Sequence, residues 1–200
     1  SKKKKLPVVL EREEAIRLVK IPNKRYLTGL RNLAILRIML NMGLRVGEVA
    51  NLKPGNINLT SQKLRIVDGK GGKDRDLVIP LSVVDTLKEW KKRKPKDTKY
   101  FFTTIKNRKD SKFASSKGKK LSVRNIQAMV EKYTKRAGIN KNVTPHTLRH
   151  TFATEYYRQT KDIETLRLIL GHSDISTTQI YITLANIDVE SGMNGFRIIA

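Results

Sequence analysis

The 200-residue sequence contains no cysteine, one tryptophan and only 18 acidic residues against 42 lysines and arginines. Without cysteine the chain forms no disulfide, no cysteine-based zinc site and no thiol nucleophile. This composition is compatible with the cytosol, where we expect the protein to act. No apolar run approaches the ~18 residues of a membrane-spanning helix. The apolar run that follows the basic N-terminal residues is too short for the hydrophobic region of a signal peptide. We therefore expect neither a membrane span nor a signal peptide.

The shortage of acidic residues leaves a formal net charge of +24. A surplus of this size opposes compaction by self-repulsion unless the partner is a polyanion. Nucleic acid is the first candidate and an anionic membrane surface the second. The excess is concentrated between residues 88 and 120, where Pro95 and several serines indicate a loop rather than an amphipathic basic helix. The charge therefore favours nucleic acid over a membrane.

Basic residues in and near this segment are the candidates for contacts with the phosphate backbone. A lysine or arginine taken alone is usually only a solvated surface group, so the interpretation depends on the cluster as a whole. The candidates are Lys73, Arg75, Lys92, Lys94, Lys106, Arg108, Lys109, Lys117, Lys119 and Lys120.

Apolar residues spaced three and four apart predict a mainly helical chain. Helices are expected over residues 11–20, 28–42, 45–52, 82–93, 122–137, 146–159, 162–170, from about 176 through Tyr181, and 189–199. Residues 63–67 and 76–79 instead indicate a β-hairpin with a glycine-rich turn, and 56–59 a third strand. The predicted fold class is therefore mainly α with a small antiparallel β-sheet (α+β).

Two familiar kinds of site are disfavoured by the order of residues. The segment Gly69-Lys70-Gly71-Gly72-Lys73 lies between two predicted strands and lacks the order of a nucleotide-binding P-loop. His146 and His150 are four residues apart on a predicted helix, but the residues between them supply an arginine and no carboxylate. That pattern disfavours a metal site.

The remaining polar residues suit a phosphodiester. Arg45 begins a short helix, and Arg149 lies one turn after His146 on the same helix face. Guanidinium groups bind phosphate oxygens through paired hydrogen bonds and can neutralise the charge of a pentavalent transition state. Lys70 lies between glycines that allow a close approach to a backbone, and the phenol of Tyr181 is a potential nucleophile. Taken singly, each residue is more often structural than catalytic.

Taken together and in order, these segments resemble the motifs of the tyrosine recombinases, the family of phage integrases and Xer proteins. Lys70 follows Arg45 by 25 residues and Tyr181 follows His172 by nine, as the family pattern expects. The resemblance covers about residues 11–185. The five matching segments are Gly43–Glu48, Gly69–Gly71, His146–Thr154, Leu170–His172 and Tyr181.

The resemblance implies a site-specific recombinase that breaks and rejoins double-stranded DNA through a 3′-phosphotyrosyl intermediate. In the family, the arginines and histidines bind the scissile phosphate, the tyrosine attacks it, and the lysine protonates the leaving 5′-oxygen. No metal or nucleotide cofactor is implied, because the bond energy is kept in the protein–DNA ester. Which histidine accepts the phenolic proton stays open. The implied catalytic residues are Arg45, Lys70, His146, Arg149, His172 and Tyr181, with Glu48 orienting its neighbours.

The expected organisation is a basic segment over residues 1–10, a catalytic domain over 11–185 and a tail over 186–200. The apolar residues of the tail would pack on a neighbouring protomer or fold back on their own core. Family members usually carry an amino-terminal DNA-binding domain, so we expect a piece of a longer protein rather than a minimal enzyme. The implied partners are double-stranded DNA, further copies of the chain as a tetramer on DNA, and accessory DNA-bending proteins, with no membrane.

Three other functions compete with this interpretation. A type IB topoisomerase uses the same phosphate chemistry, although its relatives differ around the nucleophile. A non-catalytic DNA-binding module, or a basic RNA-binding or ribosomal protein, explains the charge but not the five motifs. The sequence does not distinguish integration, excision and chromosome-dimer resolution, although it slightly favours an integrase of a mobile element.

Overall fold

The computed structural model of the chain describes residues 6–67, 74–105, 118–171 and 178–186. Its elements are α1 (Arg12–Lys20), α2 (Leu27–Met42), α3 (Val46–Asn51), a 3-10 turn (Pro54–Asn56), β1 (Ile57–Asn58), β2 (Lys63–Ile66), β3 (Arg75–Val78), α4 (Leu81–Arg93), α5 (Val123–Arg136), α6 (Pro145–Thr160) and α7 (Ile163–Leu170). Residues 179–186 are also helical. The predicted fold class, mainly α with a small antiparallel sheet, is confirmed.

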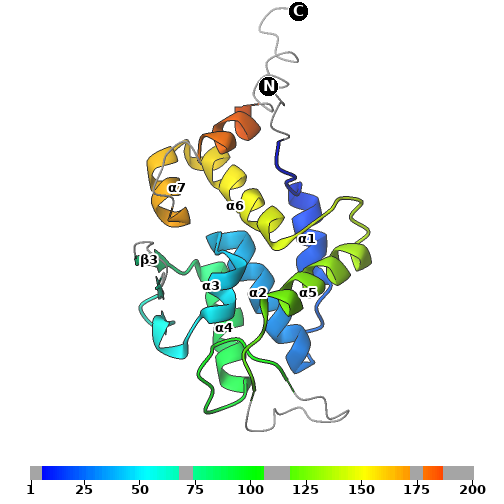
Figure 1. Cartoon of the computed structure of the whole chain (residues 1–200), viewed down its shortest axis with the longest axis vertical. Coiled ribbons are helices and arrows are strands. Elements are labelled where there is room, and N and C mark those ends of the chain that lie inside the picture. The colour runs from blue at the N-terminus through cyan, green and yellow to red at the C-terminus, as the bar shows by residue number, and fades with distance from the viewer. Residues whose placement is uncertain (1–5, 68–73, 106–117, 172–177, 187–200) are drawn as a thin grey trace, which may run out of the picture.

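Helix α2 lies at the centre of the fold, surrounded by the other helices (Figure 1). Twelve of its 16 residues are buried, because its apolar side chains point to every side rather than along one stripe. It packs chiefly against α4 and α6. The buried guanidinium of Arg31 is held by the side chain of Asn32 and by the carbonyl of Thr103, which satisfies its donors inside the core.

The sheet is small and antiparallel, with the strand order β1-β2-β3. Leu64 of β2 pairs with Ile57 of β1 and with Leu77 of β3, and all three side chains are buried against the helices. The alternation of buried and exposed residues along β2 follows the two-residue period that the sequence shows. All three predicted strands are confirmed, while the glycine-rich turn between β2 and β3 lies outside the described residues.

Part of the expected basic loop belongs to the core. Trp90 and Phe102 stack with ring centroids 6.1 Å apart, and the indole Nε1 of Trp90 donates to the carbonyl of Phe101 at 3.0 Å. The backbone N–H of Phe101 donates to the carbonyl of Leu52 at 2.7 Å, which ties the segment to the end of α3. Two adjacent apolar residues, Phe101 and Phe102, are too few to show a period, so this packing was not predictable from the hydrophobic pattern.

Local capping signals set the ends of the helices that matter for the site. The Oγ1 of Thr144 accepts from the N–H of Thr147, so α6 begins where Pro145 occupies the first position. Asp162 caps α7 in the same way, and Gly171 ends it. Both helices therefore begin where predicted, while the helix expected over 189–199 lies outside the described residues. In the part of the chain that the structure describes, no helix is long and apolar enough to cross a bilayer.

Candidate active site

Three arginines from separate elements meet at the carboxyl-terminal end of α7. They donate to the three successive carbonyls of residues 169–171: Arg75 Nε to the first at 2.7 Å, Arg149 Nη2 to the second at 2.8 Å and Arg45 Nη2 to the third at 3.4 Å. The last carbonyls of a helix lack intrahelical partners and carry its partial negative charge, so they attract cations. The end of α7 therefore gathers three positive charges that lie far apart in the sequence.

Arg149 is the most deeply placed of the three, with 4% of its surface exposed. Besides its bond to α7, its Nη1 donates to the carbonyl of Gly43 at 2.6 Å, at the end of α2. Burial, together with the positive charge of Arg45, lowers the pKa of Arg149 to about 10. The guanidinium thus stays charged at neutral pH, and two helix ends fix its orientation.

Glu48 holds the other two arginines together. Its carboxylate accepts from both terminal nitrogens of Arg75 at 2.9 Å, and from Nη1 and the backbone N–H of Arg45 at 3.0 and 2.7 Å. Burial alone raises the pKa of Glu48, but the hydrogen bonds and charge of Arg75 outweigh it and leave that pKa below 4.5. Glu48 is therefore an ionised carboxylate whose bonds orient the arginines and set the first turn of α3.

Glycines make this convergence sterically possible. Gly43 and Gly171 end α2 and α7 with φ of +66° and +65°, a region that side chains disfavour. A Cβ at Gly43 would lie 2.3 Å from the ring of Phe152, and one at Gly171 would lie 3.0 Å from Nη1 of Arg75. Glycine at position 171 thus leaves room for the guanidinium of Arg75, and glycine at position 43 leaves room for the ring of Phe152.

Tyr181 adjoins this cation cluster, on the short helix over residues 179–186. Its side chain packs with those of Phe152, Leu166 and Leu170, and only 2% of its surface is exposed. Burial raises the pKa of Tyr181, while the positive charges of Arg149 and then Arg45 act in the opposite direction. The phenol is therefore protonated at neutral pH and lies in the field of two arginines.

His150 contacts the phenol directly. Its Nδ1 lies 2.9 Å from the hydroxyl of Tyr181, and the two rings are tilted by 44° with centroids 5.8 Å apart. Burial first, and then the charges of His146 and Arg149, lower the pKa of His150 from 6.5, so its ring is neutral at neutral pH. The sequence motifs assign His150 no role in catalysis, and its place directly after Arg149 is the only signal that points to one.

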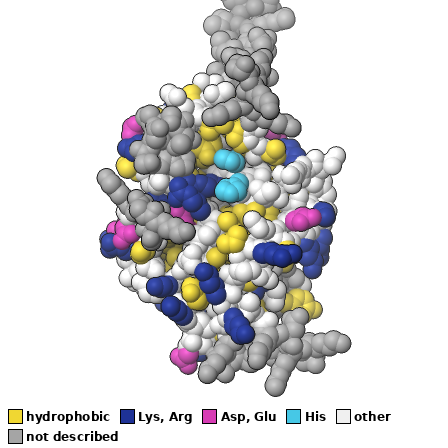
Figure 2. All heavy atoms as spheres, viewed as in Figure 1, with side chains coloured by type: hydrophobic (Ala, Val, Ile, Leu, Met, Phe, Trp, Pro, Cys, Tyr) yellow, Lys and Arg dark blue, Asp and Glu magenta, His cyan; other side chains and the backbone are white. Residues whose placement is uncertain are grey.

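Hydrogen bonds join most of the predicted catalytic residues that fall in described segments. Figure 2 shows the two described histidines together, beside a group of Lys and Arg side chains. His146 is exposed one turn before His150 on α6. Contacts join Arg45, Glu48 and Arg149 through the end of α7, and Tyr181 to α6. The predicted residues outside the described segments are Lys70, Lys73, Lys106, Arg108, Lys109, Lys117 and His172.

Two residues expected to contact DNA bind protein groups instead. The side chain of Arg75 is 9% exposed and is engaged by Glu48 and α7, as described above. Lys94 is also buried, and its ammonium donates to the carbonyl of Pro95 at 3.0 Å and to Oγ1 of Thr98 at 2.6 Å. Burial disfavours a direct DNA contact for both residues, and a positive charge in the sequence does not reveal whether its side chain is buried.

Three other members of that set are exposed: Lys92, Lys119 and Lys120. The ammonium of Lys120 donates to Oδ1 of Asn51 at 2.5 Å, at the carboxyl-terminal end of α3. Arg45 and Asn51 lie at opposite ends of that helix, which rises ~1.5 Å per residue, so their backbone positions are ~9 Å apart along its axis. The basic segment before α5 thus flanks the cation cluster.

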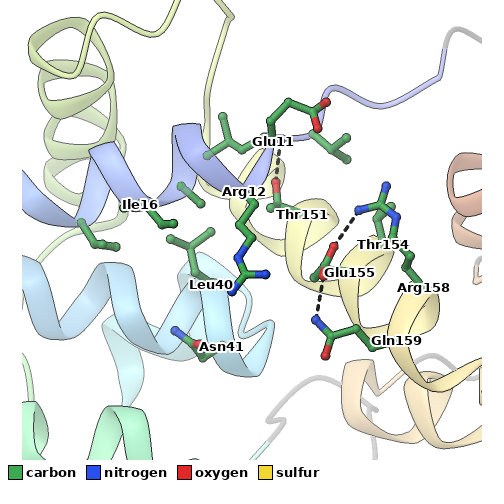
Figure 3. Close-up of a pocket in the computed structure, with 14 residues that line it drawn as sticks. Glu11, Arg12, Ile16, Leu40, Asn41, Thr151, Thr154, Glu155, Arg158 and Gln159 are labelled. Atoms are coloured by element: carbon green, nitrogen blue, oxygen red, sulfur yellow. Dashed lines mark hydrogen bonds and ion pairs between the residues drawn. The ribbon is translucent and has the colours of Figure 1, made fainter. Parts of the chain in front are cut away.

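A pocket of about 300 Å³ lies elsewhere, between the segment before α1 and helices α1, α2 and α6 (Figure 3). Its polar lining is paired in part: Glu155 accepts from Arg158 and from Gln159, each at 2.6 Å. These residues lie on α6 away from Arg149, which does not line the pocket. The candidate chemistry therefore belongs to the open face and not to this cavity.

Comparison with known proteins identifies relatives along almost the whole chain. The model of the Phage integrase family matches residues 8–186. The chain is 36% identical over 178 residues to the tyrosine recombinase XerA of Pyrococcus furiosus. This alignment covers 89% of this chain and 58% of that protein. It is 34% identical over 200 residues to XerD of Staphylococcus haemolyticus, covering 97% of this chain and 64% of the other. The chain thus spans about three fifths of these relatives.

Solved structures share the same fold. The crystal structure of XerA recombinase superposes with a TM-score of 0.74 at 32% identity, over 94% of this chain and 66% of that one. XerH recombinase bound to its difH substrate after cleavage gives a TM-score of 0.73 at 27% identity, over 94% and 53% of the two chains. The catalytic domain of bacteriophage HP1 integrase matches over 94% of each chain, with a TM-score of 0.61 at 24% identity.

Proposed function

Because the chain belongs to the phage integrase family, the tyrosine recombinases, we propose that it is the catalytic part of a site-specific DNA recombinase. The observation that carries this proposal is the convergence of Arg45 and Arg149 at one helix end, beside the hydroxyl-bearing ring of Tyr181. A clamp of two guanidiniums next to one phenol suits in-line attack on a phosphodiester. The relatives solved with cleaved DNA support the same assignment.

In the proposed reaction, the phenolic oxygen of Tyr181 attacks the phosphorus of the scissile phosphodiester. The bond to the 5′-oxygen breaks, and the DNA is left joined to the protein as a 3′-phosphotyrosyl ester. Attack on this ester by the 5′-hydroxyl of a second strand rejoins the DNA and frees the tyrosine. The ester conserves the bond energy, so no cofactor is required for the exchange.

The arginines would act on the phosphate throughout this cycle. The transition state carries one more negative charge than the bound diester, and preorganised cations stabilise such charge most where water is excluded. Arg45, whose side chain is 36% exposed, would contact the phosphate oxygens from the surface. Arg149 is buried and would contact the same oxygens from the protein side. By family resemblance, Lys70 would protonate the leaving oxygen, and His146 and His172 would donate further hydrogen bonds.

The DNA itself would lie across the face that holds the cation cluster. Among the described residues, the proposed phosphate contacts are the exposed Lys92, Lys119 and Lys120. The remaining candidates, outside the described residues, stay in the proposal. A tetramer on DNA, with residues 186–200 packing on a neighbouring protomer, and accessory DNA-bending proteins are part of the same proposal.

Covalent capture tests the proposal without knowledge of the recognised sequence. A random-sequence library of nicked duplexes is incubated with the chain, and protein-linked DNA is isolated after denaturation. We expect an adduct with the wild type and none with Tyr181→Phe. The matched control is Tyr26→Phe, the same change at a tyrosine that is 70% exposed, and this variant should still form the adduct. An adduct of undiminished yield from Tyr181→Phe would refute the assignment.

A second measurement separates the recombinase from a type IB topoisomerase. Captured sequences are rebuilt as intact duplexes and offered together with a partner duplex. A recombinase joins strands between the two molecules, whereas a topoisomerase only nicks, relaxes and reseals its own substrate. Supercoil relaxation without exchange would therefore favour the topoisomerase.

A further inference from the structure

We propose that His150 accepts the phenolic proton of Tyr181 as the phosphotyrosyl ester forms. This inference depends on the proposed function and adds to it a base that the sequence motifs leave unassigned. It starts from one contact, the 2.9 Å between Nδ1 of His150 and the hydroxyl of Tyr181. A general base must lie within hydrogen-bond reach of the proton that it removes, and His150 meets this condition.

Burial makes such a partner necessary. With 2% of its surface exposed, Tyr181 cannot release its proton freely to bulk water. Burial also raises its pKa, so the phenolate does not form unaided at neutral pH. Among the described residues, His150 is the group that is hydrogen-bonded to this hydroxyl.

The charges around His150 favour a neutral ring before DNA binds. His146 and Arg149 on its own helix lower its pKa in addition to burial, and Arg45 acts on the adjoining phenol. A neutral imidazole that carries its hydrogen on Nε2 has a lone pair on Nδ1, and this lone pair can accept from the phenol. The resting site thus holds an acid and a base in contact, with the proton on the oxygen.

DNA binding changes this balance. A phosphodiester held by Arg45 and Arg149 brings one negative charge, and its transition state brings a second. This charge offsets the repulsion that an imidazolium at His150 would otherwise meet from the two guanidiniums. Proton transfer from Tyr181 to His150 therefore becomes favourable when the phosphate is in place, and the phenol keeps its proton when no DNA is bound.

The step balances in protons and bonds. The O–H bond of Tyr181 breaks as its oxygen bonds to phosphorus, and the proton moves to Nδ1 of His150. The P–O5′ bond breaks, and the departing oxygen takes its proton from the acid proposed above, Lys70. In the rejoining step the attacking 5′-hydroxyl gives its proton to the now neutral Lys70, and the imidazolium of His150 returns its proton to the phenolic oxygen of Tyr181 as the ester breaks.

His146 is less well placed for this task. It is exposed, and no hydrogen bond joins it to Tyr181 among the described residues. Its position one turn earlier on α6 suits a donor to a bound phosphate, as the family resemblance implies. The two histidines of one helix would thus act on different atoms of the same reaction.

Two substitutions separate proton transfer from positioning. His150→Asn places an amide near Nδ1 and can keep the hydrogen bond, but it cannot hold a proton, whereas His150→Ala removes both functions. We expect both variants to lose ~10²–10⁴-fold in single-turnover cleavage, the range typical of a general base. Unchanged thermal midpoints and DNA affinity would show that fold and binding are intact. Cleavage by His150→Asn at the wild-type rate would overturn the proposal.

A more acidic nucleophile gives an independent readout. A fluorinated tyrosine at position 181 ionises more readily, so it depends less on a base. We expect the loss caused by His150→Asn to shrink with this residue, and an equal loss with either tyrosine would overturn the proposal. If wild-type protein forms no adduct at all, the proposed function fails; if wild type and His150→Ala form it equally fast, only the role of His150 fails.

Discussion

Arg75 binds the carboxylate of Glu48 with both of its terminal nitrogens, each 2.9 Å from an oxygen. The same carboxylate binds the side chain and backbone of Arg45, one of the two arginines proposed to hold the phosphate. Arg75 therefore acts on the site through Glu48 rather than through DNA. Arg75, on β3, thus helps to position Arg45, at the start of α3.

Loss of Arg75 should destabilise the fold. Arg75→Ala leaves Glu48 buried without its bidentate partner, and breaking a buried ion pair costs ~3–5 kcal/mol. We expect a loss of this order in the free energy of unfolding from urea titration, together with slower cleavage. The control is Arg65→Ala, on the neighbouring strand, where a side chain 58% exposed meets Asp74 at 3.6 Å; such a pair contributes at most ~1 kcal/mol. Equal losses from both variants would contradict this account of Arg75.

Stability should fall in acid partly because of Glu48. Its pKa in the folded protein is below the ordinary 4.5, so its charge stabilises the fold above that pH, and this contribution disappears as the pH falls through the lowered value. Glu48→Gln should be less stable than the wild type at neutral pH. The difference between their free energies of unfolding should become smaller as the pH falls. Urea midpoints of both proteins between about pH 7 and pH 3 measure this difference. A constant difference across the range would show that Glu48 does not titrate as proposed.

Three glycines offer a graded test of crowding at the site. Gly138, Gly171 and Gly43 share φ of +65° to +66°, so alanine at each meets a similar backbone penalty of ~1–2 kcal/mol. A Cβ at Gly138 has nothing within 4 Å, one at Gly171 lies 3.0 Å from Arg75, and one at Gly43 lies 2.3 Å from the ring of Phe152. Thermal unfolding should rank the losses in that order, with Gly43→Ala the most damaging. Equal losses at all three would mean that only the backbone conformation matters.

The salt dependence of DNA binding should report the flanking lysines. Changing Lys119 and Lys120 to Gln removes two proposed phosphate contacts, and each contact contributes ~0.9 to the slope of log K against log salt. We expect the slope to fall by about 1.8 in titrations of fluorescent duplex DNA. The control pair is Lys20→Gln with Lys24→Gln, where Lys20 is the exposed last residue of α1 and Lys24 an exposed residue of the turn that follows it. An unaltered slope in the first variant, or an equal change in the second, would move the DNA surface elsewhere.

Local chemistry made much of the fold predictable. A capping residue determines where a helix begins or ends through bonds to residues only a few positions away. The helix ends predicted from such residues therefore agree with the structure: Thr144 with the proline after it, Asp162, and the glycines that end α2 and α7. The hairpin strands follow from alternation in the same way. These signals depend on the chain neighbours of each residue and not on the rest of the molecule.

Properties that depend on distant parts of the chain were not predictable. The sequence shows that Arg75 and Lys94 are cations, but only packing reveals that both are buried and already bound. The contact between His150 and Tyr181, which are 31 residues apart in the sequence, requires the short helix that carries Tyr181 to pack on α6. The ordered motifs predict which residues belong to the site, whereas only the tertiary structure shows the hydrogen bonds among them.

The meeting of three arginines at the end of α7 has a consequence for synthesis of the protein. Two of them, Arg45 and Arg75, are translated long before the carbonyls of residues 169–171 that hold them. A growing chain therefore cannot assemble the three-arginine cluster until residues 169–171 have been synthesised. The cluster is thus completed late in folding, by hydrogen bonds that join residues 94 and 126 positions apart in the sequence.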